Sequence, residues 1–223
     1  MKTSPLDFIL STIVLTALAL SAGLLVLSSA NYLTTLVFPK YHPIIDSLFF
    51  LFIYGILSAI TTRLILKLKP FTPGTYDMHS PLFTCWKLFT VIYEFGRGAL
   101  LPFTVVFFKP VVAKLFGANI GKDIALGGHL VDPELITIGD EAIIGQDSVI
   151  TAHTITSGYL SLAPVNIGPR ATIGVNTVVM SGVEIGEGSV VTAGSVIPPD
   201  TKIPPFELWG GSPATKIKVL DAR

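Results

Sequence analysis

The residue best suited to acid–base chemistry in this sequence is His153, which stands where a regular six-residue pattern is interrupted. A neutral imidazole can take a proton from an amine or a hydroxyl as that group attacks an acyl carbon. Such a direct transfer needs no covalent intermediate, so no serine or cysteine nucleophile is required. We therefore take His153 as the candidate general base.

Two other polar residues of the same pattern stand out. His129 takes the fourth slot of its hexapeptide, as His153 does, and precedes it by 24 residues. This spacing predicts that the two histidines lie on different faces of one solenoid and could share a cleft between neighbouring copies. Asp132 replaces an aliphatic residue and precedes Pro133. Two alternatives remain open for Asp132: a turn at a corner, or a carboxylate that orients a substrate or a histidine.

The pattern is a repeat of six residues that begins at Ile120. Its lead positions are Ile120, Leu126, Asp132, Ile138, Ile144, Ile150, Ile167, Ile173, Val179, Ile185, Val191, Ile197, Ile203 and Trp209. Glycine often follows the lead residue, which we attribute to bend angles that other residues resist. The fifth residue is small or β-branched, as expected of a second inward-facing side chain. Three six-residue faces per coil predict a triangular β-helix with a continuous core.

The N-terminal half is predicted to be a membrane domain. Half of the 223 residues are hydrophobic, only 13% are charged, and the mean hydropathy is +0.68. Segments at about 8–37 and 44–66 can cross a bilayer as helices, with a signal peptide as the alternative for the first. The charged interruptions in 82–116 favour interfacial or re-entrant helices. We expect a helical membrane domain at 1–117 and a β-helix domain at 118–223.

The distribution of charge predicts the topology. Arg63, Lys67 and Lys69 follow the second apolar segment, whereas the preceding loop offers only Lys40. The positive-inside rule then places the C-terminal domain in the cytoplasm, on a multi-pass protein of the cytoplasmic membrane. No basic run resembles a nucleic-acid footprint.

Two side chains within the apolar half stand out. Glu94 and Arg97 are three residues apart, so on a helix they share one face. They are either a surface ion pair that anchors the helix to headgroups, or part of a passage for a lipid-like substrate. Cys85 is the only cysteine and can form no disulfide within the chain.

Three segments of the repeat resemble the bacterial hexapeptide-repeat acyltransferases: IGDEAIIGQDSVI, IGPRATIGVNTVVMSGVEIGEGSVVTAGSVIPPD and WGGSPATKI. The maltose, galactoside and virginiamycin acetyltransferases are the best-known members. The resemblance covers about residues 118–219 and implies left-handed coils, a homotrimer, and acyl-CoA or acetyl-CoA bound in clefts between subunits. In these enzymes a loop leaves the helix just after the catalytic histidine, which supports His153. The combination with membrane segments bears a weaker resemblance to the C-terminal portion of polylysine-synthetase-type peptide synthetases.

The resemblance also implies residues that bind the donor. Ala193 and Gly194 match the turn that approaches the pantetheine, and Lys216 and Lys218 match the basic residues that meet the phosphates. The family often has Lys or Arg directly after the Pro-Ala pair, where this chain has Thr215, so the nucleotide contacts depart from the family pattern.

The sequence therefore predicts an acyl-CoA-dependent N- or O-acyltransferase. The acyl group is acetyl or longer, and the acceptor is a membrane-associated or amphipathic molecule, either small or lipid-linked. A thioester on a carrier protein is the alternative donor, and no metal is expected. A non-catalytic membrane-anchored trimeric scaffold is the alternative function. A γ-carbonic-anhydrase-like protein is a minor one, because its zinc needs three histidines and the β-helix has only His129 and His153.

Overall fold

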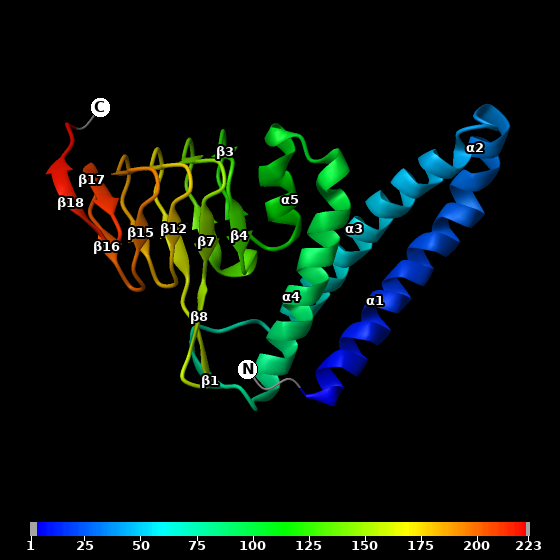
Figure 1. Cartoon of the computed structure of the whole chain (residues 1–223), viewed down its shortest axis with the longest axis horizontal. Helices are drawn as coiled ribbons and strands as arrows, with labels where there is room; N and C mark the ends of the chain where they lie inside the picture. Colours follow the sequence, from blue (N-terminus) through cyan, green and yellow to red (C-terminus); the bar gives the residue numbers. More distant parts are fainter. Residues whose placement is uncertain (1–3, 222–223) are drawn as a thin grey trace. The chain divides into compact units, whose positions relative to one another are not determined.

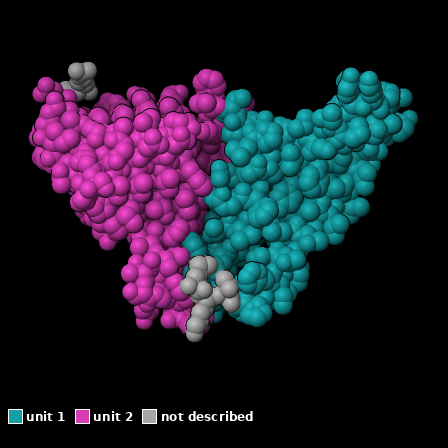
Figure 2. Space-filling model, in the orientation of Figure 1, with its two compact units in different colours: residues 1–70, 81–105 teal, residues 71–80, 106–223 magenta. Residues whose placement is uncertain are grey.

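The computed structural model describes residues 4–221 and divides into two compact units (Figure 2). One consists of Met1–Pro70 and Pro81–Val105, and is helical. The other consists of Phe71–Ser80 and Val106–Arg223, and is mainly a stack of short parallel strands (Figure 1). The predicted fold class, a helical region followed by a parallel β-solenoid, is confirmed.

The helical unit contains three long helical segments. Its elements are α1 (Pro5–Leu25), a π-helical turn η1 (Val26–Ala30), α2 (Asn31–Val37), α3 (His42–Leu68), α4 (Pro81–Leu100) and η2 (Leu101–Phe103). By length and composition, Pro5–Val37 and His42–Leu68 could each cross a membrane. Both predicted spans lie within these helices.

Polar contacts fix the helix ends and join the helices to one another. The N-terminus of α1 is closed by a capping box, in which the Ser4 hydroxyl and the Asp7 carboxylate satisfy free backbone amides. The ammonium of Lys87 on α4 also contacts Asp7, and both side chains are largely buried. On α3, Asp46 Oδ1 accepts a 2.7 Å hydrogen bond from the Thr34 hydroxyl on α2. These contacts set the register of α1, α2 and α4 against their neighbours.

The solenoid is a prism with three parallel sheets as its faces. The first sheet contains β2 (Asn119–Ile120), β5 (Ile136–Ile138), β10 (Val165–Ile167), β13 (Glu184–Ile185) and β16 (Lys202–Ile203). The second contains β3 (Ala125–Leu126), β6 (Ile143–Ile144), β11 (Thr172–Ile173), β14 (Val190–Val191) and β17 (Glu207–Gly211), and ends in an antiparallel hairpin with β18 (Ala214–Val219). The third contains β4 (His129–Val131), β7 (Val149–Thr151), β12 (Val178–Val179) and β15 (Val196–Ile197), which stand in a row in Figure 1.

The core of the prism follows the repeat. Lead residues stack on the lead residues of the next coil, as Ile138 does on Ile167 and Ile167 on Ile185. Most side chains at the fifth position of the hexapeptide are fully buried, and serines there donate hydrogen bonds to backbone carbonyls. Ser189 Oγ donates to the Pro204 carbonyl and Ser195 Oγ to the Thr192 carbonyl, both at 2.7 Å. A small side chain with a nearby carbonyl thus meets the demand that buried polar groups be hydrogen-bonded.

The reason for glycine after the lead residues differs from the predicted one. A Cβ at Gly145 would lie 2.5 Å from Val175 N, and one at Gly174 would lie 2.4 Å from Ala193 N. Neither glycine has a φ in the left-handed region; the positive φ angles occur two residues later, as at Asp147 and Asn176. The prediction that these glycines supply unusual bend angles is therefore wrong. They are needed because the backbone of the next coil passes too close for a side chain.

The first coil departs from the six-residue count. In the third sheet Leu130 pairs with Ile150. Leu130 therefore occupies the inward-facing lead position that the six-residue period assigned to Asp132. The 3₁₀ turn η4 (Pro133–Leu135) follows directly and makes this coil longer: His129 lies opposite Val149, twenty residues on, whereas Ala125 lies opposite Ile143, eighteen residues on.

The predicted loop after Ile150 is a β-hairpin. It consists of β8 (His153–Thr156) and β9 (Tyr159–Leu162), joined through Ser157 and Gly158, which both have the positive φ that a type I′ hairpin turn requires. A strand from the linker between α3 and α4, β1 (Gly74–Asp77), pairs antiparallel with β9. The linker therefore belongs to the solenoid and holds the hairpin in a three-stranded sheet (Figure 1).

The solenoid also begins earlier in the chain than residue 118. Ala113 of α5 (Lys109–Leu115) is buried in the core of the prism, and Lys109 Nζ donates to the Gly127 carbonyl at 3.0 Å. With η3 (Val106–Phe108), this helix belongs to the second unit. The expected boundary between 117 and 118 thus does not coincide with the division into units.

Candidate active site

The candidate base and a carboxylate meet at one corner of the prism. Asp132 comes directly after β4, and His153 begins β8 two residues after β7 ends. Because β4 and β7 are neighbouring parallel strands, their C-terminal ends lie side by side. His153 Nδ1 accordingly lies 2.5 Å from Asp132 Oδ2. We call these two residues the dyad.

The surroundings of the dyad favour one tautomer of the imidazole. The Asp132 side chain is 1% exposed and that of His153 is 22% exposed. An ionised carboxylate can only accept hydrogen bonds, so this contact favours the tautomer of a neutral imidazole that carries its hydrogen on Nδ1. The Thr151 hydroxyl lies 3.3 Å from Nδ1 and 3.3 Å from the His153 carbonyl. The dyad therefore presents an oriented imidazole that can accept a proton at Nε2.

The backbone of Asp132 explains how a buried carboxylate is held at this corner. Its φ and ψ are 62° and 59°, the left-handed conformation that Asp tolerates better than most residues. Pro133 follows and starts the 3₁₀ turn. The two alternatives left open by the sequence are thus both present: Asp132 makes a turn, and its side chain contacts the histidine.

Sequence reasoning missed one buried acid beside the dyad. Both carboxyl oxygens of Glu134 are buried, and neither has a hydrogen-bond partner within residues 4–221. Burial raises the pKa of Glu134 well above its usual range, and the negative charge of Asp132 raises it further. The sequence signal was an acidic residue two positions after Asp132, in a stretch that otherwise alternates apolar residues with turn residues.

His129 lies at the other end of β4 from Asp132. It begins β4, whereas Asp132 follows the end of that strand, so roughly 10 Å of extended backbone separates them. His129 also pairs with Val149 at the start of β7, the strand that leads to His153. The cleft that His129 would share with His153 of another copy stays a prediction.

The residues predicted to bind the donor lie at the surface of the prism. Ala193 and Gly194 form an exposed turn, and a Cβ at Gly194 would meet nothing within 4 Å. Lys218 is exposed on β18. Lys216 instead contacts the buried carboxylate of Glu207. Hydrogen bonds from Lys216 and then from the Trp209 indole lower the pKa of Glu207. Lys216 thus already has a structural partner, whereas the turn is open to a ligand.

Glu94 and Arg97 belong to the helical unit, on α4. Arg97 Nη2 donates to Glu94 Oε2 at 2.8 Å, and Arg97 Nε is buried with no hydrogen-bond partner in the described part of the chain. The predicted ion pair on one helix face is therefore present. Whether it anchors the helix or lines a passage stays a prediction.

No metal-binding cluster occurs in the region that the structure describes. Within residues 4–221, no three or more His, Cys, Asp or Glu side chains lie together where they could hold a metal ion.

The repeat has a match among known protein families. Residues 164–199 match the bacterial transferase hexapeptide model of six repeats. This chain carries a hexapeptide-repeat solenoid. The resemblance predicted from the sequence is therefore confirmed.

Curated relatives of the hexapeptide-repeat chain include two named enzymes. The galactoside O-acetyltransferase of Escherichia coli is 32% identical over 126 residues, which cover 52% of this chain and 61% of that protein. The delta-poly-L-ornithine synthetase of Acinetobacter baumannii is 24% identical over 150 residues, which cover 67% of this chain but 11% of that protein. The chain thus spans less than two thirds of the length of either relative.

Among solved structures, the chain is similar to a hexapeptide-repeat acetyltransferase of Vibrio cholerae complexed with acetyl coenzyme A. The identity is 30%, the TM-score is 0.44, and the match covers 48% of this chain and 62% of that one.

Proposed function

We propose that this hexapeptide-repeat protein is an acyltransferase in which the Asp132–His153 dyad activates the acceptor. The observation that carries the proposal is the 2.5 Å contact between Asp132 Oδ2 and His153 Nδ1 at the corner where the hairpin leaves the prism. The repeat and the galactoside acetyltransferase relative support the same class of reaction.

In the proposed reaction, His153 Nε2 accepts the proton of the acceptor. As the amine or hydroxyl of the acceptor attacks the thioester carbonyl, its proton passes to Nε2. The new bond to the acyl carbon forms, the carbon–sulfur bond breaks, and the thiol leaves with the proton that the imidazole held. The negative charge of Asp132 stabilises the imidazolium between these two transfers, and the short contact keeps the ring from rotating.

Acyl-CoA is the proposed donor substrate. The exposed turn at Ala193 and Gly194 leaves room for the pantetheine to approach the backbone. Lys218 is exposed and can meet a phosphate, whereas Lys216 would first have to leave Glu207. The turn is thus the better-supported part of the donor site.

The helical unit supports a membrane location. Two of its helical segments are long and apolar enough to cross a bilayer. We propose that they anchor the enzyme in the cytoplasmic membrane with the solenoid in the cytoplasm, where CoA is available, and that the acceptor is amphipathic or lipid-linked. We further propose a homotrimer, in which the outward His153 faces a neighbouring subunit.

Release of free thiol tests the proposal. Full-length protein in detergent micelles is mixed with acetyl-CoA and longer acyl-CoAs, together with a panel of amine and hydroxyl acceptors. With an acceptor that turns over, His153→Ala should reduce the rate by about 10²–10⁴, the usual contribution of a positioned base.

The controls separate chemistry from binding and assembly. Acyl-CoA binding and the trimer, followed by native mass spectrometry, should survive His153→Ala. A variant that keeps nearly the full rate would show that His153 is not the base. Donor binding by the wild type without turnover of any acceptor would favour the scaffold.

A further inference from the structure

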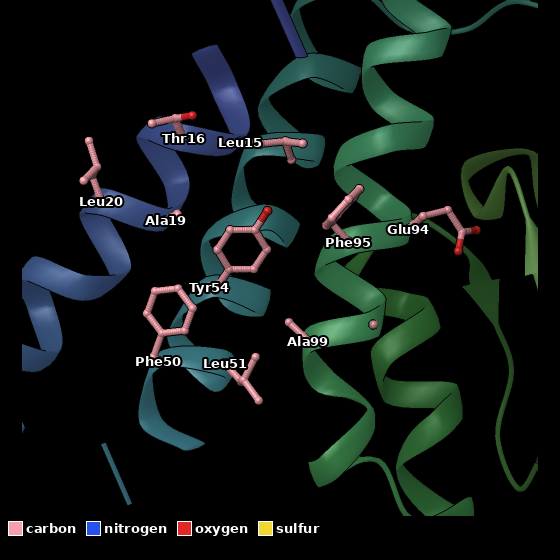
Figure 3. Close-up of a pocket in the computed structure, with 11 residues that line it drawn as sticks. Leu15, Thr16, Ala19, Leu20, Phe50, Leu51, Tyr54, Glu94, Phe95 and Ala99 are labelled. Atoms are coloured by element: carbon pink, nitrogen blue, oxygen red, sulfur yellow. The ribbon is translucent and has the colours of Figure 1, made fainter. Parts of the chain in front are cut away.

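The helical unit contains an apolar recess that the proposed reaction does not use (Figure 3). It has a volume of about 840 Å³ and lies between α1, α3 and α4. The lining includes Leu15 and Ala19 from α1, Phe50 and Tyr54 from α3, and Gly98 from α4. This volume falls within the ~300–1,000 Å³ typical of small-molecule sites.

The recess is open to the outer surface of the helices. Leu20 and Phe95, both on its lining, are 63% and 60% exposed. A ligand can therefore enter from the side, without passing through the packed core formed by residues such as Leu18 and Ile92.

The lining offers a ligand almost nothing but apolar surface. The only charged residue of the lining is Glu94, and its carboxylate accepts a hydrogen bond from Arg97. Figure 3 shows that carboxylate directed away from Phe50, Leu51 and Leu20. The electrostatic complement of such a site is an uncharged, apolar group, because a charged one would lose its hydration without gaining a partner.

The dimensions of the recess argue against a helix from a second copy. On α4 the lining runs from Glu94 to Ala99, which is roughly 8 Å at 1.5 Å per residue. A stable protein interface needs about 800 Å² from each partner, far more than so short a stretch can offer. A narrow chain fits this length, whereas a packed helix needs contacts over several turns.

We propose that this recess binds the hydrocarbon chain of a membrane lipid. The proposal rests on the membrane location proposed above, because only there do such chains surround α1 and α3. Gly98 keeps the site open: a Cβ added there would meet nothing within 4 Å. A larger side chain at this position therefore fills the space without displacing a neighbour.

The test uses a phosphatidylcholine that carries a diazirine on one acyl chain, in liposomes of otherwise unlabelled phosphatidylcholine that contain the full-length protein. After irradiation, mass spectrometry maps the labelled residues. We expect labels concentrated on the lining segments of α1, α3 and α4. Gly98→Leu should lower this labelling by roughly an order of magnitude, because its side chain occupies the space.

Gly23→Leu is the matched control. Gly23 also lies in a long helix with nothing within 4 Å of an added Cβ, but it lines another, smaller hollow of about 390 Å³, which shares Phe50 and Leu51 with the recess. Labelling of the recess residues on α4, none of which line the second hollow, should be unchanged in this variant.

Three results would overturn the proposal. The first is equal recess labelling in Gly98→Leu and the wild type, and the second is labels spread evenly along α1 and α3. The third is an unlabelled recess together with a changed oligomeric state in Gly98→Leu, which would assign the recess to a second copy. The readout is independent of catalysis: His153→Ala should lose thiol release and keep the labelling. Failure of the recess and failure of the proposed reaction are therefore distinguishable.

Discussion

Asp132→Asn is the most direct test of the dyad, because it removes a charge while keeping the shape of the side chain. The carboxylate is 1% exposed and lies 2.5 Å from His153 Nδ1. A hydrogen bond to a charged group contributes about 1.5–3 kcal/mol. If this contact acts fully in the transition state, its loss lowers kcat by about 10- to 150-fold, since each ~1.4 kcal/mol is a factor of ten. Asparagine can also turn its amide nitrogen towards the ring and favour the wrong tautomer.

The assay is steady-state thiol release, with acyl-CoA and acceptor varied in turn. We expect kcat to fall while KM for acyl-CoA stays the same, because Asp132 is placed to act on the imidazole and not on the donor. Asp147→Asn is the matched control: Asp147 also has a left-handed φ, 58°, but it is exposed and does not contact the dyad. An Asp132→Asn enzyme that retains at least half of the wild-type kcat, or an equal loss in Asp147→Asn, would refute the orienting role.

Three further changes test the structure around the site by thermal unfolding. Burial raises the pKa of Glu134, so the folded state binds the extra proton and the wild type loses stability as pH rises above about 4.5. Glu134→Gln should therefore be more stable than the wild type by about 1–3 kcal/mol at alkaline pH, and the gap should close in acid; a gap independent of pH would contradict the burial. Lys216→Met should show the opposite effect: it should be less stable than the wild type at neutral pH. The lowered pKa of Glu207 gives the wild type stability above about pH 4.5 that is lost as pH falls through the lowered value, so the two curves should converge in acid and differ at pH 7. Gly145→Ala should cost about 1–3 kcal/mol, because its Cβ would lie 2.5 Å from the next coil.

The sequence by itself determined the features that depend on period and local composition. The six-residue period fixed the three-sided solenoid, because each coil must repeat the same short strands to stack on the next. The small fifth residues, such as Ser189 and Ser195, follow from the narrow interior of the prism and lie buried as expected. The break after Ile150 marked the hairpin that His153 begins, and long uncharged stretches marked α1 and α3.

Only the tertiary structure decided which residues meet across neighbouring coils. The contact between Asp132 and His153 depends on a first coil of twenty residues, which shifts Leu130 into the inward place. The pairing of β1 with β9 joins segments more than 80 residues apart, and no periodicity in the sequence predicts it. Position 145 likewise requires glycine for a reason that no periodicity shows, because the backbone of another coil passes close to it. These features depend on insertions and on how closely the coils stack, and such non-local distances exist only once the chain has folded.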